Sequence, residues 1–270
     1  MAILFSAAAA ASQVGLGYGL GVIAWSPLPG KPTATDSGAW PSNLAWTALI
    51  AATSVVIGAV AADRLGHTVH IGRTSRALRR VVVCLAAAVG GAALIPLVVV
   101  PAQYAQVDAT FAPHILVGVY AAVGLVAGLI VALPATAVRA IAANVFATVG
   151  WLWALAIIVL INRSVAAQRP GYVPLGVWKF TENGPTYGRY YLPGALIMLG
   201  SALLIGGLAA FPSAGRGARR LGIVISGAIG PLLIAGAYRL ADPDPTKTPF
   251  EELSAFYLSP YVAVAGLVGA

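Results

Sequence analysis

The chain has 270 residues, of which 59% are hydrophobic and only 9% are charged, and its formal net charge is +8. Soluble domains carry about 25% charged residues, so this composition excludes an ordinary water-soluble fold. Uncharged runs of roughly 20 residues recur along the chain, the length that an α-helix needs to cross the hydrocarbon core of a bilayer. These runs lack the alternation typical of a transmembrane β-barrel. We therefore expect an all-α, polytopic membrane protein.

Charged, proline-rich and glycine-rich segments divide the chain into about eight predicted transmembrane helices. They are expected at residues 3–25, 44–62, 81–104, 115–137, 140–161, 192–211, 221–240 and 253–270. The first is interpreted as a retained helix rather than a cleaved signal, because no basic region precedes its apolar run. The single cysteine, Cys84, lies within the third helix, so neither an internal disulfide nor a thiolate metal site is expected.

The charges predict how the helices are oriented. Eight helices place nine arginines against one acid, Asp63, on one side of the bilayer, while the loops on the other side have balanced charges. The positive-inside rule then places the basic side and both termini in the cytoplasm of a cell membrane. The basic loops are expected to contact anionic lipid headgroups rather than nucleic acid. The nine arginines are Arg64, Arg73, Arg76, Arg79, Arg80, Arg139, Arg216, Arg219 and Arg220.

Short sequence matches suggest a duplication of four helices plus four, with halves 1–139 and 140–270. Residues 48–54 resemble 195–201, and residues 120–126 resemble 261–268, in the same order along each half. Because Ala, Val, Leu and Gly dominate the chain, such matches also arise by chance, and the first and fifth helices do not match. Parallel repeats of this kind, related by a two-fold axis along the membrane normal, occur in transporters.

Two prolines, Pro96 and Pro231, lie near the middle of the third and seventh predicted helices. Each proline removes a backbone donor and frees a carbonyl one turn earlier, so each marks either a packed kink or the wall of a cavity. No ionisable residue occurs at this depth, which argues against proton-coupled or ion-coupled transport. The polar residues at this depth are Gln13, Thr47, Thr53, Ser54, Asn144, Thr148, Ser201 and Ser226, with Asn144 grouped with the two prolines as a cavity or kink residue.

Small residues at helical spacing predict close helix packing. Gly15, Gly17, Gly19 and Gly21 alternate along the first helix, and Gly222, Ser226 and Gly230 follow one another every four residues on the seventh. Spacings of this type let helix backbones approach closely in membranes. A phosphate-binding role is not expected, because the glycine run neither follows a strand nor opens a helix.

The segment between the fifth and sixth helices gathers aromatic side chains on the outer side. Such residues form either an interfacial belt or a docking surface for a partner or a glycan. The residues predicted for this surface are Tyr172, Trp178, Phe180, Tyr187 and Tyr190.

Acidic residues near the outer helix ends allow an enzymatic alternative. Asp36, Asp242, Asp244 and Glu251 would catalyse a reaction of a lipid-linked substrate if two of them converged. The alternative without a catalytic role is that residues 242–245, Asp-Pro-Asp-Pro, form a stiff turn with solvated charges. His67 and His70 have a spacing that suits zinc on a helix, but no third ligand is near.

Taken together, the sequence predicts a non-catalytic transport or permease-like subunit, or a membrane scaffold, that acts with membrane or soluble partners. The alternative is a membrane enzyme acting on a lipid-linked substrate at the outer face. No cofactor and no metal are expected. The preference for arginine over lysine and the many alanines are typical of a bacterium with a GC-rich genome.

Overall fold

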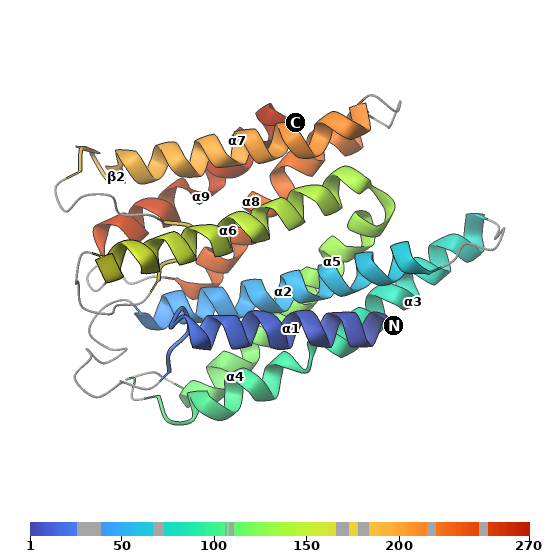
Figure 1. Ribbon diagram of the computed structural model, residues 1–270, viewed down its shortest axis with the longest axis horizontal. Coiled ribbons are helices and arrows are strands. Elements are labelled where there is room, and N and C mark those ends of the chain that lie inside the picture. The colour runs from blue at the N-terminus through green and yellow to red at the C-terminus, as the bar shows by residue number, and fades with distance from the viewer. Residues whose placement is uncertain are drawn as a thin grey trace.

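The computed structural model describes residues 1–25, 39–66, 73–105, 107, 111–165, 173–177, 184–214, 220–242 and 248–270. Within these residues the chain is a bundle of long helices with one short hairpin (Figure 1). Eight spans are long and apolar enough to cross a membrane, and α3 and α4 together form one of them. The predicted all-α membrane bundle with eight spans is therefore confirmed. The elements are α1 (Ala2–Gly19), α2 (Ala39–Leu65), α3 (Arg73–Gly91), α4 (Leu94–Ala102), α5 (Pro113–Ala137), α6 (Arg139–Val165), β1 (Thr186–Tyr187), β2 (Tyr190–Tyr191), α7 (Leu192–Ala214), α8 (Arg220–Ala241) and α9 (Phe250–Gly269).

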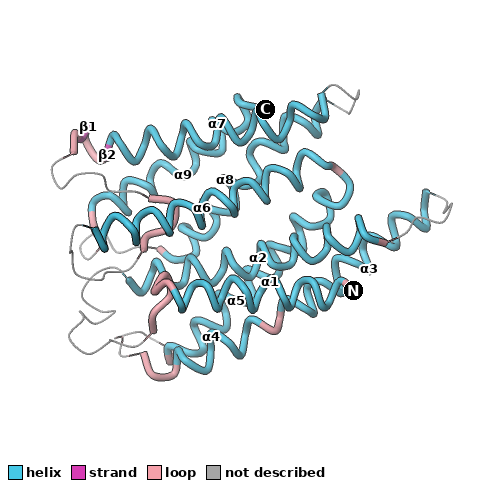
Figure 2. The backbone as a smooth tube through the Cα atoms, in the orientation of Figure 1, coloured by secondary structure: helices cyan, strands magenta, loops and turns pink. Residues whose placement is uncertain are grey.

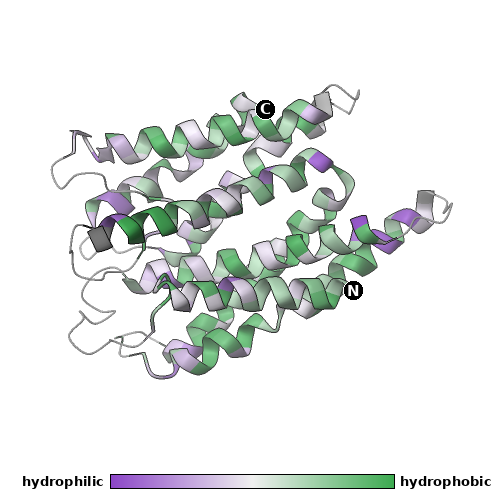
Figure 3. Cartoon of the chain, viewed as in Figure 1, coloured by the Kyte–Doolittle hydropathy of each residue, from purple (hydrophilic) through white to green (hydrophobic). Residues whose placement is uncertain are grey.

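The two ends of the bundle differ in charge. Hydrophobic residues cover the long middle of the helices, and hydrophilic residues gather on the first turns of α3 (Figure 3). We call the end with the α2–α3, α5–α6 and α7–α8 connections the arginine end, and the opposite end, which carries β1 and β2, the hairpin end. The N-terminus lies at the arginine end (Figure 1). There, Arg79 forms an ion pair of 2.6 Å with Asp63.

Helix α1 ends at Gly19, six residues before the predicted end at Trp25. Gly21 adopts a left-handed φ of +69°. The backbone N–H of Val22 then donates to the Gly17 carbonyl at 2.8 Å, which is the bonding pattern of a Schellman cap. The chain folds back on the helix, and the indole N–H of Trp25 donates to the Tyr18 hydroxyl at 2.8 Å. The prediction of a longer helix was wrong because glycine at this position favours the cap over another turn.

The third predicted helix is broken into α3 and α4 between Gly91 and Leu94, where Figure 2 shows a short loop. Pro96 lies in the first turn of α4, where a missing backbone N–H leaves no helical bond unmade. The Ala92 carbonyl, one turn earlier, accepts from the N–H of Ile95 at 3.0 Å. The break therefore satisfies the carbonyl that a continuous helix would have left free. Pro96 itself is exposed on the outside of the bundle.

Helix α2 is the centre of the bundle. It packs against α1, α3, α5, α6 and α8, and 89% of its most apolar span is buried inside the protein. Glycines permit the closest of these contacts, because a side chain at Gly124 or Gly128 of α5 would meet the α2 carbonyls of Ala48 or Ala52. Helices α2 and α5 join the first four spans to α6 and α8 of the last four, while α7 and α9 lie on the far side. The core is thus continuous across the chain.

Candidate functional site

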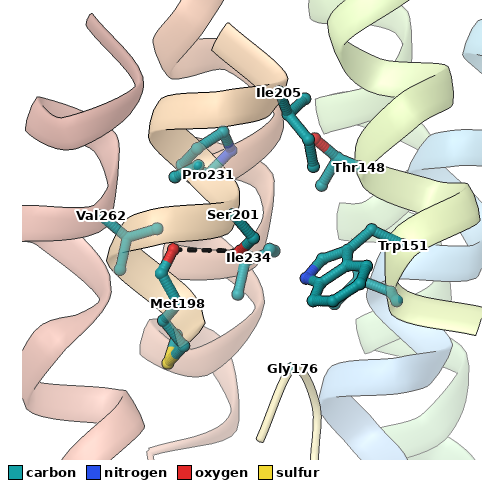
Figure 4. Close-up of a pocket in the computed structure, with 11 residues that line it drawn as sticks. Thr148, Trp151, Gly176, Met198, Ser201, Ile205, Pro231, Ile234 and Val262 are labelled. Carbon is teal, nitrogen blue, oxygen red and sulfur yellow. Dashed lines mark hydrogen bonds between the residues drawn. The ribbon is translucent and has the colours of Figure 1, made fainter. Parts of the chain in front are cut away.

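A small cavity lies at the middle of the second half of the bundle (Figure 4). Its volume is about 20 Å³. Thr148, Ser201 and Pro231 line it from near the middle of α6, α7 and α8, which places it halfway between the two ends of the bundle. None of the lining residues carries a charge. The lining consists of Thr148, Trp151, Leu152, Gly176, Met198, Ser201, Ala202, Ile205, Pro231, Ile234 and Val262.

Pro231 leaves one backbone carbonyl beside the cavity without its usual helical donor, and Asn144 supplies a donor in its place. In a regular helix the Gly227 carbonyl would accept from the N–H of residue 231, which proline lacks. The side-chain amide of Asn144, on α6, donates to that carbonyl at 3.4 Å. Its oxygen also accepts from the backbone N–H of Gly230 at 2.8 Å. One fully buried asparagine therefore forms hydrogen bonds with both Gly227 and Gly230, just before the proline, and links α6 to α8.

Thr148 follows Asn144 by one helical turn and faces the same stretch of α8. It is only 5% exposed, and its hydroxyl has no hydrogen-bond partner within the described part of the chain. A buried hydroxyl left without a partner costs about 1–3 kcal/mol. A Cβ atom at Gly230 would lie 2.1 Å from the Thr148 Oγ1 atom. The absence of a side chain at Gly230 is what allows α6 to come this close to α8.

The cavity is covered toward the hairpin end by residues 173–177, which reach down into the bundle from the segment between α6 and α7. Val173, Leu175 and Val177 are buried among the core residues. The Val173 carbonyl accepts from the Ser42 hydroxyl at 3.1 Å and from the Trp46 indole N–H at 2.9 Å. We call residues 173–177 the plug. Part of the predicted outer aromatic segment is therefore an internal element.

A hydrogen bond from α8 and a left-handed glycine fix the conformation of the plug. The buried Tyr238 hydroxyl donates to the Leu175 carbonyl, which ties the plug to α8. Gly176 adopts a φ of +69° and contributes to the cavity lining. This left-handed conformation is one that glycine adopts without strain. The sequence contains this glycine, but no periodic pattern marks it as a buried turn.

A second polar network lies between α1, α2 and α6 and is satisfied internally. Gln13 donates to the Ser54 hydroxyl at 3.0 Å, and its oxygen accepts from the Trp153 indole at 3.3 Å. The Thr53 hydroxyl donates to the Leu49 carbonyl at 2.8 Å and lies 3.3 Å from the same Gln13 oxygen. Ser6 donates to the Ser54 carbonyl at 3.0 Å. All these groups are buried or nearly so. The network links α1, α2 and α6 through hydrogen bonds among its own polar atoms.

The structure separates the residues that the sequence grouped as a cavity or kink. Pro231 lines the cavity and Asn144 holds the carbonyl freed by it, whereas Pro96 faces outward on α4. Thr148 and Ser201 line the same cavity from facing helices, although their sequence spacing assigns them no shared role. The spacing of Asn144 and Thr148, one turn apart on α6, was the available signal for a polar face.

The acids of the enzymatic alternative are only partly described. Asp36 and Asp244 lie outside the described residues, as do His67 and His70. Asp242 follows the end of α8 with a φ of +42°, and Glu251 lies in the first turn of α9. In the described part of the chain, no group of three metal-binding side chains converges. Glu252, beside Glu251, is buried at the start of α9, where a carboxylate interacts favourably with the helix dipole.

The predicted aromatic surface is likewise only partly described, because Tyr172, Trp178 and Phe180 lie outside the described residues. Tyr187, on β1, is 74% exposed. Tyr190, on β2, is half-buried against the core. The hairpin turn carries Arg189, whose guanidinium lies 4.8 Å from the centre of the Tyr257 ring.

No protein-family model, curated protein or solved structure matches this chain. The bundle and its interior are therefore the basis for a functional proposal. Chemically, the described cavity lining offers two hydroxyls, an indole, a thioether and apolar surface, and no acidic, basic, imidazole or thiol side chain.

Proposed function

We propose that this chain is a non-catalytic, multi-pass membrane subunit that acts as a scaffold and holds partners in or at the bilayer. The observation that carries this proposal is the close packing of the interior in the part of the chain that the structure describes. The central helix α2 is surrounded by other helices, and the buried polar groups between α1, α2 and α6 are bonded to one another. The cavity among α6 to α9 has a volume of only about 20 Å³. A solute path would require wider space and uncommitted polar groups.

The charge asymmetry supports an orientation for this scaffold in a cell membrane. We place the arginine end and both termini in the cytoplasm, following the positive-inside rule. At that end Arg79 is engaged by Asp63, while Arg76 and Arg139 are exposed. Exposed arginines near the bilayer surface each gain about 1 kcal/mol from anionic lipids, so we propose acidic headgroups as the first partners of this end.

The hairpin end supplies the proposed protein-facing surface. Tyr187 presents most of its ring to solvent on a two-residue strand that is closed by a tight turn at Gly188 and Arg189. Exposed tyrosine with few rotatable bonds is a common contact residue in interfaces. We propose that a membrane or soluble partner docks here, over the aromatic segment between α6 and α7.

The test compares partner contact with solute flux. A photoreactive side chain is placed at Tyr187, with a matched control at Val126, an exposed apolar residue of α5. The scaffold proposal expects one discrete cross-linked product at Tyr187 in native membranes, and diffuse lipid adducts at Val126. Purified chain in sealed vesicles should not accelerate swelling in a panel of neutral solutes. Rapid swelling together with no discrete product at Tyr187 would refute the proposal.

A transport role is the second candidate, and the cavity is the observation in its favour. Substrate sites of many transporters lie at the bilayer midplane beside interrupted helices, and Pro231 and Thr148 occupy a comparable depth. In a background of Cys84→Ala, Ser201→Cys should resist a membrane-impermeant thiol reagent if the bundle is a scaffold. Labelling of that cysteine from either side of the membrane would indicate a water-filled path and favour transport.

A further inference from the structure

One half-buried arginine at the arginine end has no acidic partner within the described part of the chain. There, the side chains of Arg76 and Arg139 are exposed, and Arg79 is paired with Asp63 at 2.6 Å. Arg80 differs from these residues, because it is half-buried and its Nε atom is sealed from solvent without a hydrogen-bond partner. A charge that is taken partly out of water costs free energy unless an opposite charge lies beside it.

The stem of Arg80 is held where α3 packs against α2 and α5. Cys84 lies one turn further along the same face of α3 and is fully buried, in a cluster with Ala132 and Ala135 of α5. The acid at the end of α2, Asp63, already accepts from Arg79 through its carboxylate and its backbone carbonyl. With the Nε atom sealed, the donors of Arg80 that a ligand can reach are the terminal nitrogens, Nη1 and Nη2.

Arg80 lies where α3 changes from hydrophilic to hydrophobic. Leu78 and Val82, two residues to either side of it, are 65% and 57% exposed, and Leu85 is 49% exposed. The first turns of α3 are hydrophilic and the later turns are hydrophobic (Figure 3). In a helix that spans a membrane, this order puts the guanidinium at the boundary between headgroups and hydrocarbon, which is the level of the lipid phosphates.

We propose that Arg80 binds the phosphate group of one anionic phospholipid at the junction of α3 and α5. The inference deepens the proposed contact of the arginine end with acidic headgroups and rests on that proposal. The two terminal nitrogens of a guanidinium match two phosphate oxygens in a fork-shaped pair. Because the buried stem of Arg80 fixes the direction of this fork, the lipid is held at one position, unlike the lipids attracted by the exposed Arg76 and Arg139.

The first test counts the lipid molecules that the purified chain retains. The chain is incubated in detergent with phosphatidylglycerol, and its mass is measured under native conditions. The wild type should retain one phosphatidylglycerol molecule, and Arg80→Gln should weaken this retention about tenfold or more. Arg76→Gln, an exposed arginine one turn earlier on the same helix, is the matched control and should retain the lipid. Equal retention by the wild type and Arg80→Gln would overturn the proposal.

The chemistry of the bound group is tested with three further comparisons. Arg80→Lys keeps the charge and loses the fork, so its retention should lie between those of the wild type and Arg80→Gln. Phosphatidylcholine, which carries a phosphate but no net charge, should be retained less than phosphatidylglycerol. Excess inorganic phosphate should not displace the lipid. Displacement by inorganic phosphate would mean that the site takes a soluble phosphate, and it would overturn the assignment to a lipid.

A stability measurement covers the case in which Arg80→Gln folds poorly. Excess phosphatidylglycerol should raise the Tm of the wild type and of Arg76→Gln by about 2–4 °C relative to phosphatidylcholine, because a ligand that binds the folded state stabilises it. The rise should be smaller in Arg80→Lys, which keeps a positive charge at this position. The same rise in Arg80→Lys and the wild type would contradict a fork-shaped pair with phosphate.

Comparing three variants separates this inference from the proposal on which it rests. A fall in lipid retention that is equal in Arg76→Gln, Arg80→Gln and Arg139→Gln would keep the general contact with acidic headgroups and overturn the fixed site. No change in any of the three variants would overturn both the general contact and the fixed site. The scaffold proposal is tested independently, by the cross-linked product expected at Tyr187.

Discussion

At the residue scale, the contact between Asn144 and the proline position of α8 shows how a helix-breaking residue is accommodated inside a membrane bundle. The asparagine amide reaches the Gly227 carbonyl and the Gly230 N–H, the two backbone groups that flank the missing donor of Pro231. Neighbouring side chains satisfy proline-freed backbone groups in this way because lipid cannot. The polar residue and the proline, 87 positions apart in the sequence, therefore form one structural unit.

This unit predicts a non-additive pair of substitutions. Asn144→Leu should cost about 1–2 kcal/mol in the free energy of unfolding, the range for hydrogen bonds between membrane helices. In a Pro231→Ala background the cost should be smaller, because the new backbone N–H of residue 231 can bond the Gly227 carbonyl. The measurement is a double-mutant cycle of unfolding in detergent or bicelles. Equal costs in the two backgrounds would show that the amide does not serve that carbonyl.

Gly230 predicts a steric effect with a matched control on the same helix. In Gly230→Ala the new methyl would lie 2.1 Å from Thr148 Oγ1 and 2.7 Å from Asn144 Oδ1. Forcing such contacts typically costs about 1–3 kcal/mol. Gly236→Ala, where no atom lies within 4 Å, should be neutral or stabilising by up to about 1 kcal/mol. Thermal unfolding of both variants tests this, and similar Tm values would contradict the close approach of α6 and α8.

At the element scale, the positions of the helices were predictable because bilayer thickness sets their length and hydropathy marks their middle. All eight predicted spans have a counterpart, from α1 to α9, with α3 and α4 sharing one. Their ends and interruptions were less predictable, because local backbone chemistry decides them. Gly21 ends α1 early, and the break at Gly91 to Leu94 precedes Pro96 by a turn. Neither event alters the hydropathy of the run.

The cavity could be predicted only in part, for a similar physical reason. Pro231 and Asn144 stand out as a proline and an amide within an apolar run. That they meet, and that Thr148 and Ser201 face the same space, depends on how α6, α7 and α8 pack. The plug was not predicted, since a loop rich in turn residues normally lies at the surface. Its burial requires donors from α2 and α8.

The plug predicts a local change in hydrogen exchange. Trp46→Phe removes the indole N–H that donates to Val173 O at 2.9 Å while keeping an aromatic ring. Losing one such bond, about 1 kcal/mol, should speed the exchange of the plug amides by roughly five- to tenfold. Trp40→Phe, on the same helix, is the control, because the Trp40 ring packs against the Trp25 ring. Equal exchange of residues 173–177 in both variants would mean that the indole does not anchor the plug.

At the scale of the whole molecule, the two halves show the same internal packing. In each half the second span contacts the other three, the third contacts all of them as well, and the first and fourth are not packed together. Between the halves, α2 and α5 meet α6 and α8. The contacts between the halves therefore join the second and fourth spans of the first half to the first and third spans of the second half. The duplication stays a prediction, and these contacts favour a side-by-side repetition of the halves over a two-fold axis.

The orientation of the molecule is the prediction on which its interactions depend. An even number of spans puts both termini on one side. From the described arginines at the α2–α3 and α5–α6 connections, we propose that this side is the one retained in the cytoplasm. In a Cys84→Ala background, we compare Ser75→Cys near the start of α3 with Tyr187→Cys on β1, both at exposed positions. An impermeant maleimide applied to intact cells should label the cysteine at 187 and not the one at 75, and permeabilisation should expose both. The reverse pattern would place the arginine end outside, and with it the acidic-lipid contacts proposed for Arg76 and Arg139.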